Sequence, residues 1–230
     1  MTTPNPTMPM SPYLHDALQL IDARQQPETD IEEFDVEQAV CERTQGYFID
    51  RMTLTALLRI CHELPDAETN SALLDKNALT VVETGETQLV SACEVALRSG
   101  LLRAVNARNK TQQRYALLGF TQARPSSRFS DDLLQAIAQP EPLIVIVPCI
   151  SALPRRVRAA MTKHVKLPLL SKALTLEHLR IVYPQSLSTG ANVLDAMPDN
   201  DELARVSTLQ LLLALRSSAR TAYRAAFSVG

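Results

Sequence analysis

The sequence predicts a mainly helical protein with a few short strands, in the α+β class. Leu and Ala dominate a chain of 230 residues that is 46% hydrophobic, while only 4% of the residues are aromatic and none is Trp. Aliphatic side chains of this kind favour helices and pack them ridge into groove. The runs 78–82 and 143–147 have the apolar, β-branched character of strands. The length and apolar content are sufficient for a sizeable core.

The first 50 residues predict a flexible tail followed by an acidic helical segment. Four prolines within residues 1–12 fix φ and remove amide donors, which predicts a tail without a core. Apolar residues recur at helical spacing over 13–21, and the stretch 30–45 alternates apolar residues with carboxylates. We therefore expect an acidic helical segment over 13–50, with a strongly negative outer face.

Residues 51–122 predict a small domain of helices and strands. A helix over 52–64 ends at Pro65, a short helix follows over 67–74, and a strand covers 78–82. Thr87 is a suitable N-cap for a helix to Ser99, and Gly100 stands where a left-handed C-terminal cap is expected. The pattern over 101–118 then predicts a hairpin, with strands over 101–105 and 114–118 joined by a polar loop.

Residues 129–230 predict a helical C-terminal domain. Helices are expected from Ser130 to about 138, from Pro154 to about 165, over 175–183, and from the caps at 199–202 through 203–226. The wholly apolar run 143–147 between two prolines reads as a fully buried strand. Because a lone buried strand needs others, a short sheet mixed with these helices is the alternative.

The basic residues are concentrated where the predicted hairpin lies. Residues 98–128 contain seven bases and no acid, whereas residues 1–50 contain ten acids and two bases. Five of these bases are candidate nucleic-acid contacts: Arg98, Arg103, Arg108, Lys110 and Arg114. The alternative is an ordinary solvated basic face. If these bases do contact DNA, we expect the acidic segment 28–42 to compete with DNA for binding to them.

The sequence lacks the usual patterns of catalytic and metal sites. It contains no Gly-x-Gly-x-x-Gly, no Gly-x-x-x-x-Gly-Lys-Ser/Thr, no His-Glu-x-x-His and no Gly-x-Ser-x-Gly. Its four histidines and four cysteines show no ligand spacing. We expect a non-enzymatic protein with no cofactor and no metal. The cysteine usage, with no signal peptide or membrane span in the sequence, predicts a cytoplasmic location.

The order of elements predicted for about 51–120 resembles a winged helix-turn-helix domain. The resemblance implies that 87–99 is the recognition helix and 101–118 the wing. Arg108, Lys110 and Arg114 would then lie against DNA phosphates. The helix offers few groups that read bases, and Glu94 is repelled by phosphate. Winged-helix domains also include modules that bind only protein.

A second resemblance concerns residues 153–184. The runs LPRRVRAAM and LTLEHLRIVYP look like the helical lid that follows the nucleotide-binding core of AAA+ ATPases. The resemblance implies that Arg155 or Arg156 lies near the nucleotide-sensing position of the lid. Because the sequence has no Walker-type phosphate loop, no hydrolytic residues are carried over.

These observations leave two main hypotheses for function. The first is a non-enzymatic, winged-helix, DNA-associated or regulatory adaptor that contacts duplex DNA through the basic wing. The second is an adaptor subunit of a larger cytoplasmic assembly, which binds a protein partner or a second copy through the C-terminal helix. The Leu-rich run 209–215 supports the second, because it is more apolar than one core-facing stripe requires. A relic of an ATPase that pairs with a catalytic subunit is a third hypothesis.

Overall fold

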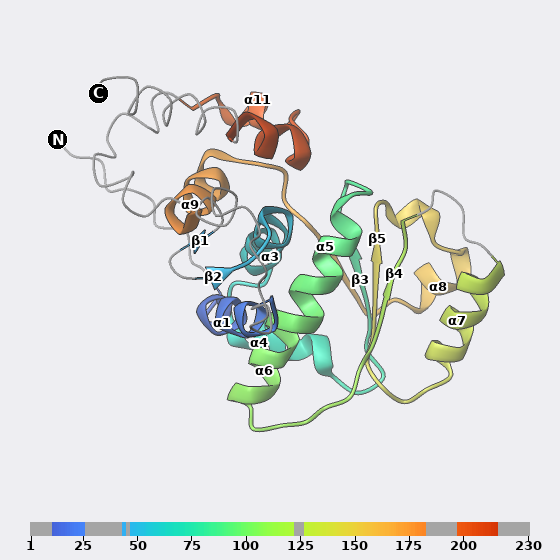
Figure 1. The fold of residues 1–230 in the computed structure, drawn as a ribbon. Coiled ribbons are helices and arrows are strands. Elements are labelled where there is room, and N and C mark those ends of the chain that lie inside the picture. Colours follow the sequence, from blue (N-terminus) through green and yellow to red (C-terminus); the bar gives the residue numbers. More distant parts are fainter. Residues whose placement is uncertain (1–10, 26–42, 45–46, 122–126, 183–196, 216–230) are drawn as a thin grey trace, which may run out of the picture.

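A four-stranded parallel sheet lies at the centre of the protein, with helices on both faces (Figure 1). The computed structural model describes residues 11–25, 43–44, 47–121, 127–182 and 197–215. The strands are β3 (Leu79–Glu83), β4 (Ala116–Gly119), β5 (Leu143–Val147) and β6 (Lys163–Lys166). Their order is β4-β5-β3-β6, and in register Val81 of β3 lies between Val145 of β5 and His164 of β6.

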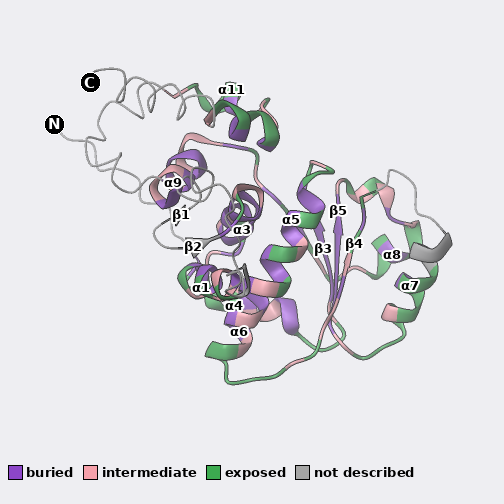
Figure 2. Cartoon of the chain, viewed as in Figure 1, coloured by how far each residue is buried: buried purple, intermediate pink, exposed green. Residues whose placement is uncertain are grey.

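Both faces of the sheet are buried at its two central strands, β3 and β5. Ile144 and Ile146 of β5 belong to the large core on one face, while Val145 and Val147 belong to a smaller core on the other. A strand covered on both sides is apolar throughout, which explains the uninterrupted run 143–147. Figure 2 shows the buried central strands β3 and β5 between half-exposed helices.

The helices of the larger core lie on the face that carries Ile144 and Ile146. They are α1 (Leu14–Gln25), α3 (Arg51–Glu63), η1 (Ala72–Leu74), α5 (Leu89–Val95), the π-helix η2 (Ala96–Leu101) and α6 (Leu102–Arg108). The short helix α4 (Ala67–Ser71) leads into η1. Helix α9 (Lys172–Val182) packs against α3, and a short hairpin of β1 (Arg43–Thr44) and β2 (Tyr47–Phe48) lies beside α1 and α9. Asp50 caps α3 by accepting a hydrogen bond from the Thr53 amide.

The opposite face of the sheet is covered by two helices. These are α7 (Ser127–Ile137) and α8 (Arg155–Ala160), whose Leu133 and Val157 contribute to the smaller core; the 3-10 turn η3 (Ile150–Ala152) links β5 to α8. At the C-terminal end, α11 (Asn200–Leu203) begins with an Asp199/Glu202 capping box. A further helix over 208–215 packs Leu211 against Leu170 and Leu203.

The expectation of a mainly helical protein with small β elements is confirmed in its coarse form. The helices expected at 13–21, 52–64, 67–74 and 175–183 and the strands at 78–82 and 143–147 are present, within a few residues. The sheet joins strands from both sides of the boundary predicted between 122 and 129. The predicted tail 1–12 and the acidic stretch 28–42 lie outside the described residues, apart from 11–12.

The predicted hairpin at 101–118 is wrong. Residues 102–108 are helix α6, and β4 pairs in parallel with β5. Gly100 is not a left-handed cap, since Gly85 is the glycine with positive φ in the described residues. Instead, a Cβ on Gly100 would lie 2.8 Å from the Ile21 Cδ1 atom. The absence of a side chain at Gly100 therefore allows α1 to pack closely against η2. The helix therefore continues because packing against α1 outweighs the local β preference.

Two C-terminal expectations also need correction. The helix predicted from Pro154 to about 165 ends at Ala160, and residues 163–166 form the edge strand β6. The stretch that resembles a helical lid is therefore partly sheet. The single helix predicted over 203–226 is interrupted at 204–207, and residues beyond 215 lie outside the described part.

Candidate functional site at the carboxyl end of the sheet

The carboxyl ends of β3 and β5 form the topological switch point of the sheet. The chain leaves β3 toward α5 on one face and leaves β5 toward α8 on the other. In open α/β sheets, ligands commonly bind in the crevice between two such strand ends. We therefore built the candidate site from the turn 84–88, which connects β3 to α5 at this point.

Backbone hydrogen bonds close the crevice between these two strand ends. The amide of Thr84 donates to the Val147 carbonyl, and the amide of Gly85 donates to the Pro148 carbonyl, each at 2.9 Å. The amide of Glu86 donates to Thr84 Oγ1 at 3.3 Å, and Gly85 has a φ of 74° that suits glycine. A loop that binds phosphate directs its amides at the ligand. Here these three amides donate hydrogen bonds within the protein, so they do not point at a phosphate.

Glu86 lies at the centre of a buried polar cluster. Its Oε1 atom accepts hydrogen bonds from Arg59 Nη1 and Thr208 Oγ1, and its Oε2 atom accepts one from the Thr208 amide, all at 2.8 Å. Three separate segments of the chain thus meet at one carboxylate: helix α3, the β3–α5 turn, and the start of the 208–215 helix. We call Arg59, Glu86 and Thr208 the Glu86 cluster.

Arg59 is the buried cation of this cluster. Its side chain is 1% exposed and that of Glu86 is 18% exposed. The guanidinium also donates to Thr208 Oγ1 at 3.1 Å and to the Thr84 carbonyl at 3.4 Å, and its Nε atom has no hydrogen-bond partner. A buried charge that loses its partner is strongly destabilising. The cluster therefore ties the C-terminal helix to the carboxyl end of the sheet.

A histidine and a glutamate also lie close together at the end of β3. His164 Nε2 of β6 is 2.9 Å from Glu83 Oε2, and the two side chains are partly exposed. The free thiol of Cys149, which follows β5, is exposed and lies 3.0 Å from Ser151 Oγ. Within the described residues, no group of three His, Cys, Asp or Glu side chains is arranged to hold a metal ion.

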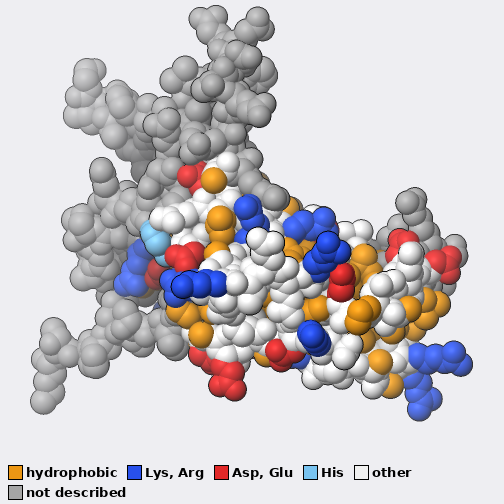
Figure 3. Space-filling model, turned by 90° about the horizontal axis from the view of Figure 1, so that it is seen from below, with side chains coloured by type: hydrophobic (Ala, Val, Ile, Leu, Met, Phe, Trp, Pro, Cys, Tyr) orange, Lys and Arg blue, Asp and Glu red, His pale blue; other side chains and the backbone are white. Residues whose placement is uncertain are grey.

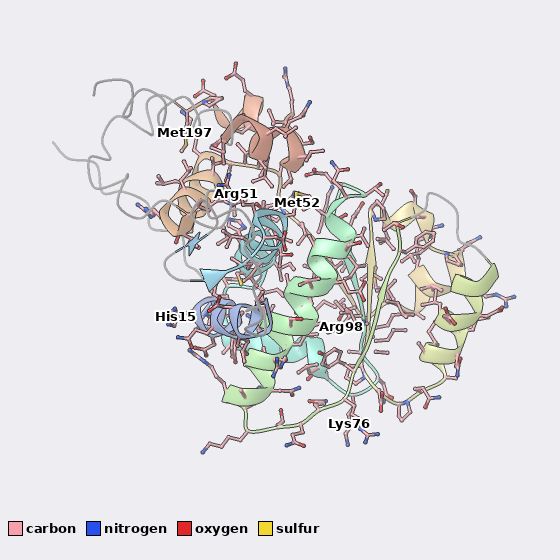
Figure 4. All side chains as sticks on the ribbon, in the orientation of Figure 1. His15, Arg51, Met52, Lys76, Arg98 and Met197 are labelled. Carbon is pink, nitrogen blue, oxygen red and sulfur yellow. The ribbon has the colours of Figure 1, made fainter. Side chains whose placement is uncertain are left out.

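The five candidate nucleic-acid contacts lie on α6, on η2 and in the loop before β4. The Nη2 atom of Arg98, which is labelled in Figure 4, is 2.8 Å from Glu94 Oε1 and 3.2 Å from the Leu117 carbonyl. With Tyr115 and Leu117, Arg98 lines an open hollow of about 300 Å³. Arg108 pairs with Asp16 of α1 and lies over the Tyr13 ring. Arg103 is partly buried, whereas Lys110 and Arg114 are exposed.

The buried thiols and one buried histidine have shifted pKa values. Burial raises the pKa of Cys61 and of Cys93 to about 12, so both stay protonated and unreactive at neutral pH. Burial, helped by the charge of Arg51, lowers the pKa of His178 to about 4. His178 Nδ1 lies 3.1 Å from Thr55 Oγ1, which joins α9 to α3. The Thr55 hydroxyl also donates to the carbonyl of Arg51, which is labelled in Figure 4.

Sequence reasoning missed the Glu86 cluster entirely. Glu86 is 27 residues from Arg59 and 122 residues from Thr208, and Arg59 is 149 residues from Thr208. No sequence motif joins the three residues. One signal was present: Arg59 interrupts the apolar face of a predicted buried helix, between Leu58 and Ile60. A charged residue at such a position requires a buried partner, although the sequence does not say which residue supplies it.

Comparison of the chain with protein-family models, curated proteins and solved structures finds no match. The geometry described above is therefore the basis for any functional conclusion. The part of the chain that the structure describes also has no helix that is both long and apolar enough to cross a membrane.

Proposed function

We propose that the chain is a protein-binding subunit that docks its C-terminal helix into an apolar groove of a different protein. The observation that carries the proposal is the exposure of two leucines on the 208–215 helix. Leu209 is 47% exposed and Leu213 is 56% exposed. Residues four apart lie on one face of a helix, so these two side chains form a single apolar stripe.

The other side of this helix is anchored to the protein. Leu211 and Leu212 are buried, and Leu211 belongs to a small core with Leu170 and Leu203. Thr208, the first residue of the helix, is held by Glu86. A helix that is fixed on one side and apolar on the other fits the mode in which a groove accepts anchors at i and i+4.

A groove on another protein is a better occupant than a second copy of the helix. A stable protein dimer buries roughly 1,200 Å² or more in total, and two leucines on each helix supply much less. A concave partner contacts more of each side chain than an identical helix does, because it surrounds the stripe on several sides. The stripe therefore favours a partner that supplies most of the buried surface.

The charge distribution at the other end of the molecule gives less support to DNA as the main partner. Arg98 and Arg108 are paired with acids of the same chain. Seen from below, on the face that includes the amino ends of the strands, Lys and Arg side chains form separate groups with acids among them (Figure 3). Binding to phosphates favours a continuous basic surface.

The test begins with a partner that copurifies with the full chain from its native cell. Binding of that purified partner is then measured by calorimetry against the wild type and Leu209→Ser/Leu213→Ser. We expect the double variant to bind at least about tenfold more weakly, because both anchors lose apolar burial. The matched control is Leu134→Ser/Ile137→Ser, which removes two exposed apolar residues of α7 and should leave the affinity unchanged.

Two results would overturn the proposal. The first is a Leu209→Ser/Leu213→Ser variant that binds the partner as tightly as the wild type does. The second is a wild-type dimer, seen by light scattering, that the same double substitution converts to a monomer, because the stripe would then be an interface between two copies of this chain.

A further inference from the structure

The Glu86 carboxylate occupies an arrangement of donors that is typical of an anion-binding site. Three donors from two different elements point at its two oxygens: the Arg59 guanidinium, the Thr208 hydroxyl and the Thr208 amide. Thr208 begins the helix described over 208–215, whose amino end carries a partial positive charge. The cation behind it is almost completely buried. Such donors recognise a carboxylate or a phosphate in the same way.

The amino end of the 208–215 helix is capped independently of Glu86. The Ser207 hydroxyl accepts from the Gln210 amide, and Gln210 Oε1 accepts from the Ser207 amide at 2.9 Å, so the helix has its own capping box. The bonds from Thr208 to Glu86 are therefore not needed to start the helix. Their effect is to hold an already formed helix on the carboxyl end of the sheet.

We propose that Arg59 and the first turn of the 208–215 helix form an anion-binding site whose ligand is the protein's own Glu86 carboxylate. The filled site is a latch: it holds the C-terminal helix against the β3–α5 turn. This inference holds whether or not Leu209 and Leu213 bind a partner, since it concerns contacts within one chain. It also places a carboxylate at the switch point, where open α/β sheets commonly bind a ligand.

The site makes a chemical prediction that a simple structural ion pair does not make. When Glu86 is shortened to Ala, the donors of Arg59 and Thr208 lose their anion and leave room for a small one. Formate or acetate has the same carboxylate geometry and should bind in its place. Chloride at the same ionic strength screens charge equally, but it lacks the two coplanar oxygens that accept hydrogen bonds from Arg59 and Thr208. Rescue by formate and not by chloride is thus the signature of the proposed site.

The experiment measures amide hydrogen exchange across the full chain for the wild type and Glu86→Ala. We expect exchange within 208–215 to be at least about tenfold faster in the variant, because the helix separates from the sheet. Formate should restore protection in the variant and leave the wild type unchanged, since its site is already filled. Glu94→Ala, which breaks the exposed pair with Arg98, is the matched control and should change nothing in 208–215.

A second variant covers the case in which Glu86→Ala does not fold. Glu86→Gln keeps the size of the side chain and one acceptor oxygen but removes the charge, and it should raise exchange in 208–215 by a smaller factor. Wild-type exchange in both folded variants would overturn the latch. Equal rescue of Glu86→Ala by formate and by chloride would overturn the anion site, because charge screening alone would then explain the recovery.

Discussion

The two ends of the parallel sheet contain similar residues in different surroundings. At the carboxyl end, Arg59 is buried, Glu86 is only 18% exposed, and both form hydrogen bonds with Thr208. At the amino end, the arginine and lysine side chains of α6 and the following loop are mostly exposed, and Arg108 pairs with Asp16 at the surface. Burial therefore decides which charges hold the fold together and which remain available to other molecules.

Physical chemistry explains why the difference is large. Water and salt screen an exposed pair, which contributes about 0 to 1 kcal/mol, whereas removing one partner of a buried pair costs about 3 to 5 kcal/mol. The high local density of positive charge in 98–128 predicts nucleic-acid contacts at the amino end. The carboxyl end has fewer charges, but each one there has more effect on the structure.

The largest expected effect is that of removing the buried cation. Arg59→Met should lower the free energy of unfolding by about 3 to 5 kcal/mol, because the Glu86 side chain, which is only 18% exposed, loses its charged partner. Urea denaturation followed by circular dichroism measures the change. Arg98→Met, at a side chain that is 51% exposed, is the control and should cost less than about 1 kcal/mol. Equal losses in the two variants would contradict the comparison.

The next effect is a loss of stability in acid that depends on His178. The folded pKa of about 4 lies below the ordinary value of 6.5, so the unfolded chain binds the proton first. Stability is therefore lost as the pH falls from about 6.5 to about 4, by up to about 3 kcal/mol in total, and the loss levels off below that range.

The check is the difference between two pH profiles of the free energy of unfolding. His178→Gln cannot titrate, so subtracting its profile from that of the wild type removes the contribution of the carboxylates. His15→Gln, at an exposed position of α1, is the control and should follow the wild type. Parallel profiles for the wild type and His178→Gln would show that His178 is not the group responsible.

The smallest expected effect concerns nucleic acid at the amino end. We expect weak, non-specific binding of duplex DNA, in which replacing Lys110 or Arg114 by Ala reduces the slope of log affinity against log salt by about 0.9 each. Arg108→Ala should reduce it less, because Asp16 already compensates that charge. Fluorescence anisotropy at several salt concentrations measures the slope. Binding that is absent, or that is insensitive to salt, would remove DNA from consideration.

Local patterns were sufficient for much of the secondary structure. The helix that ends just before Pro65, the buried strand between Pro142 and Pro148, and the Asp199/Glu202 capping box all depend on residues close together in the chain. Errors arose where packing overrides local preference. Leu101–Val105 has strand-like residues but is helical, because Gly100 allows close contact with Ile21 of α1.

The sequence by itself determined the mainly helical character, the presence of the central strand over 143–147, and the uneven charge along the chain. Each of these follows from composition or from residues within one or two turns of each other. Only the tertiary structure decided that the strands are parallel, that α6 replaces the predicted hairpin, and that Arg59, Glu86 and Thr208 meet. The physical reason is that contacts between distant segments depend on the packing of the whole core, which no local window of sequence contains.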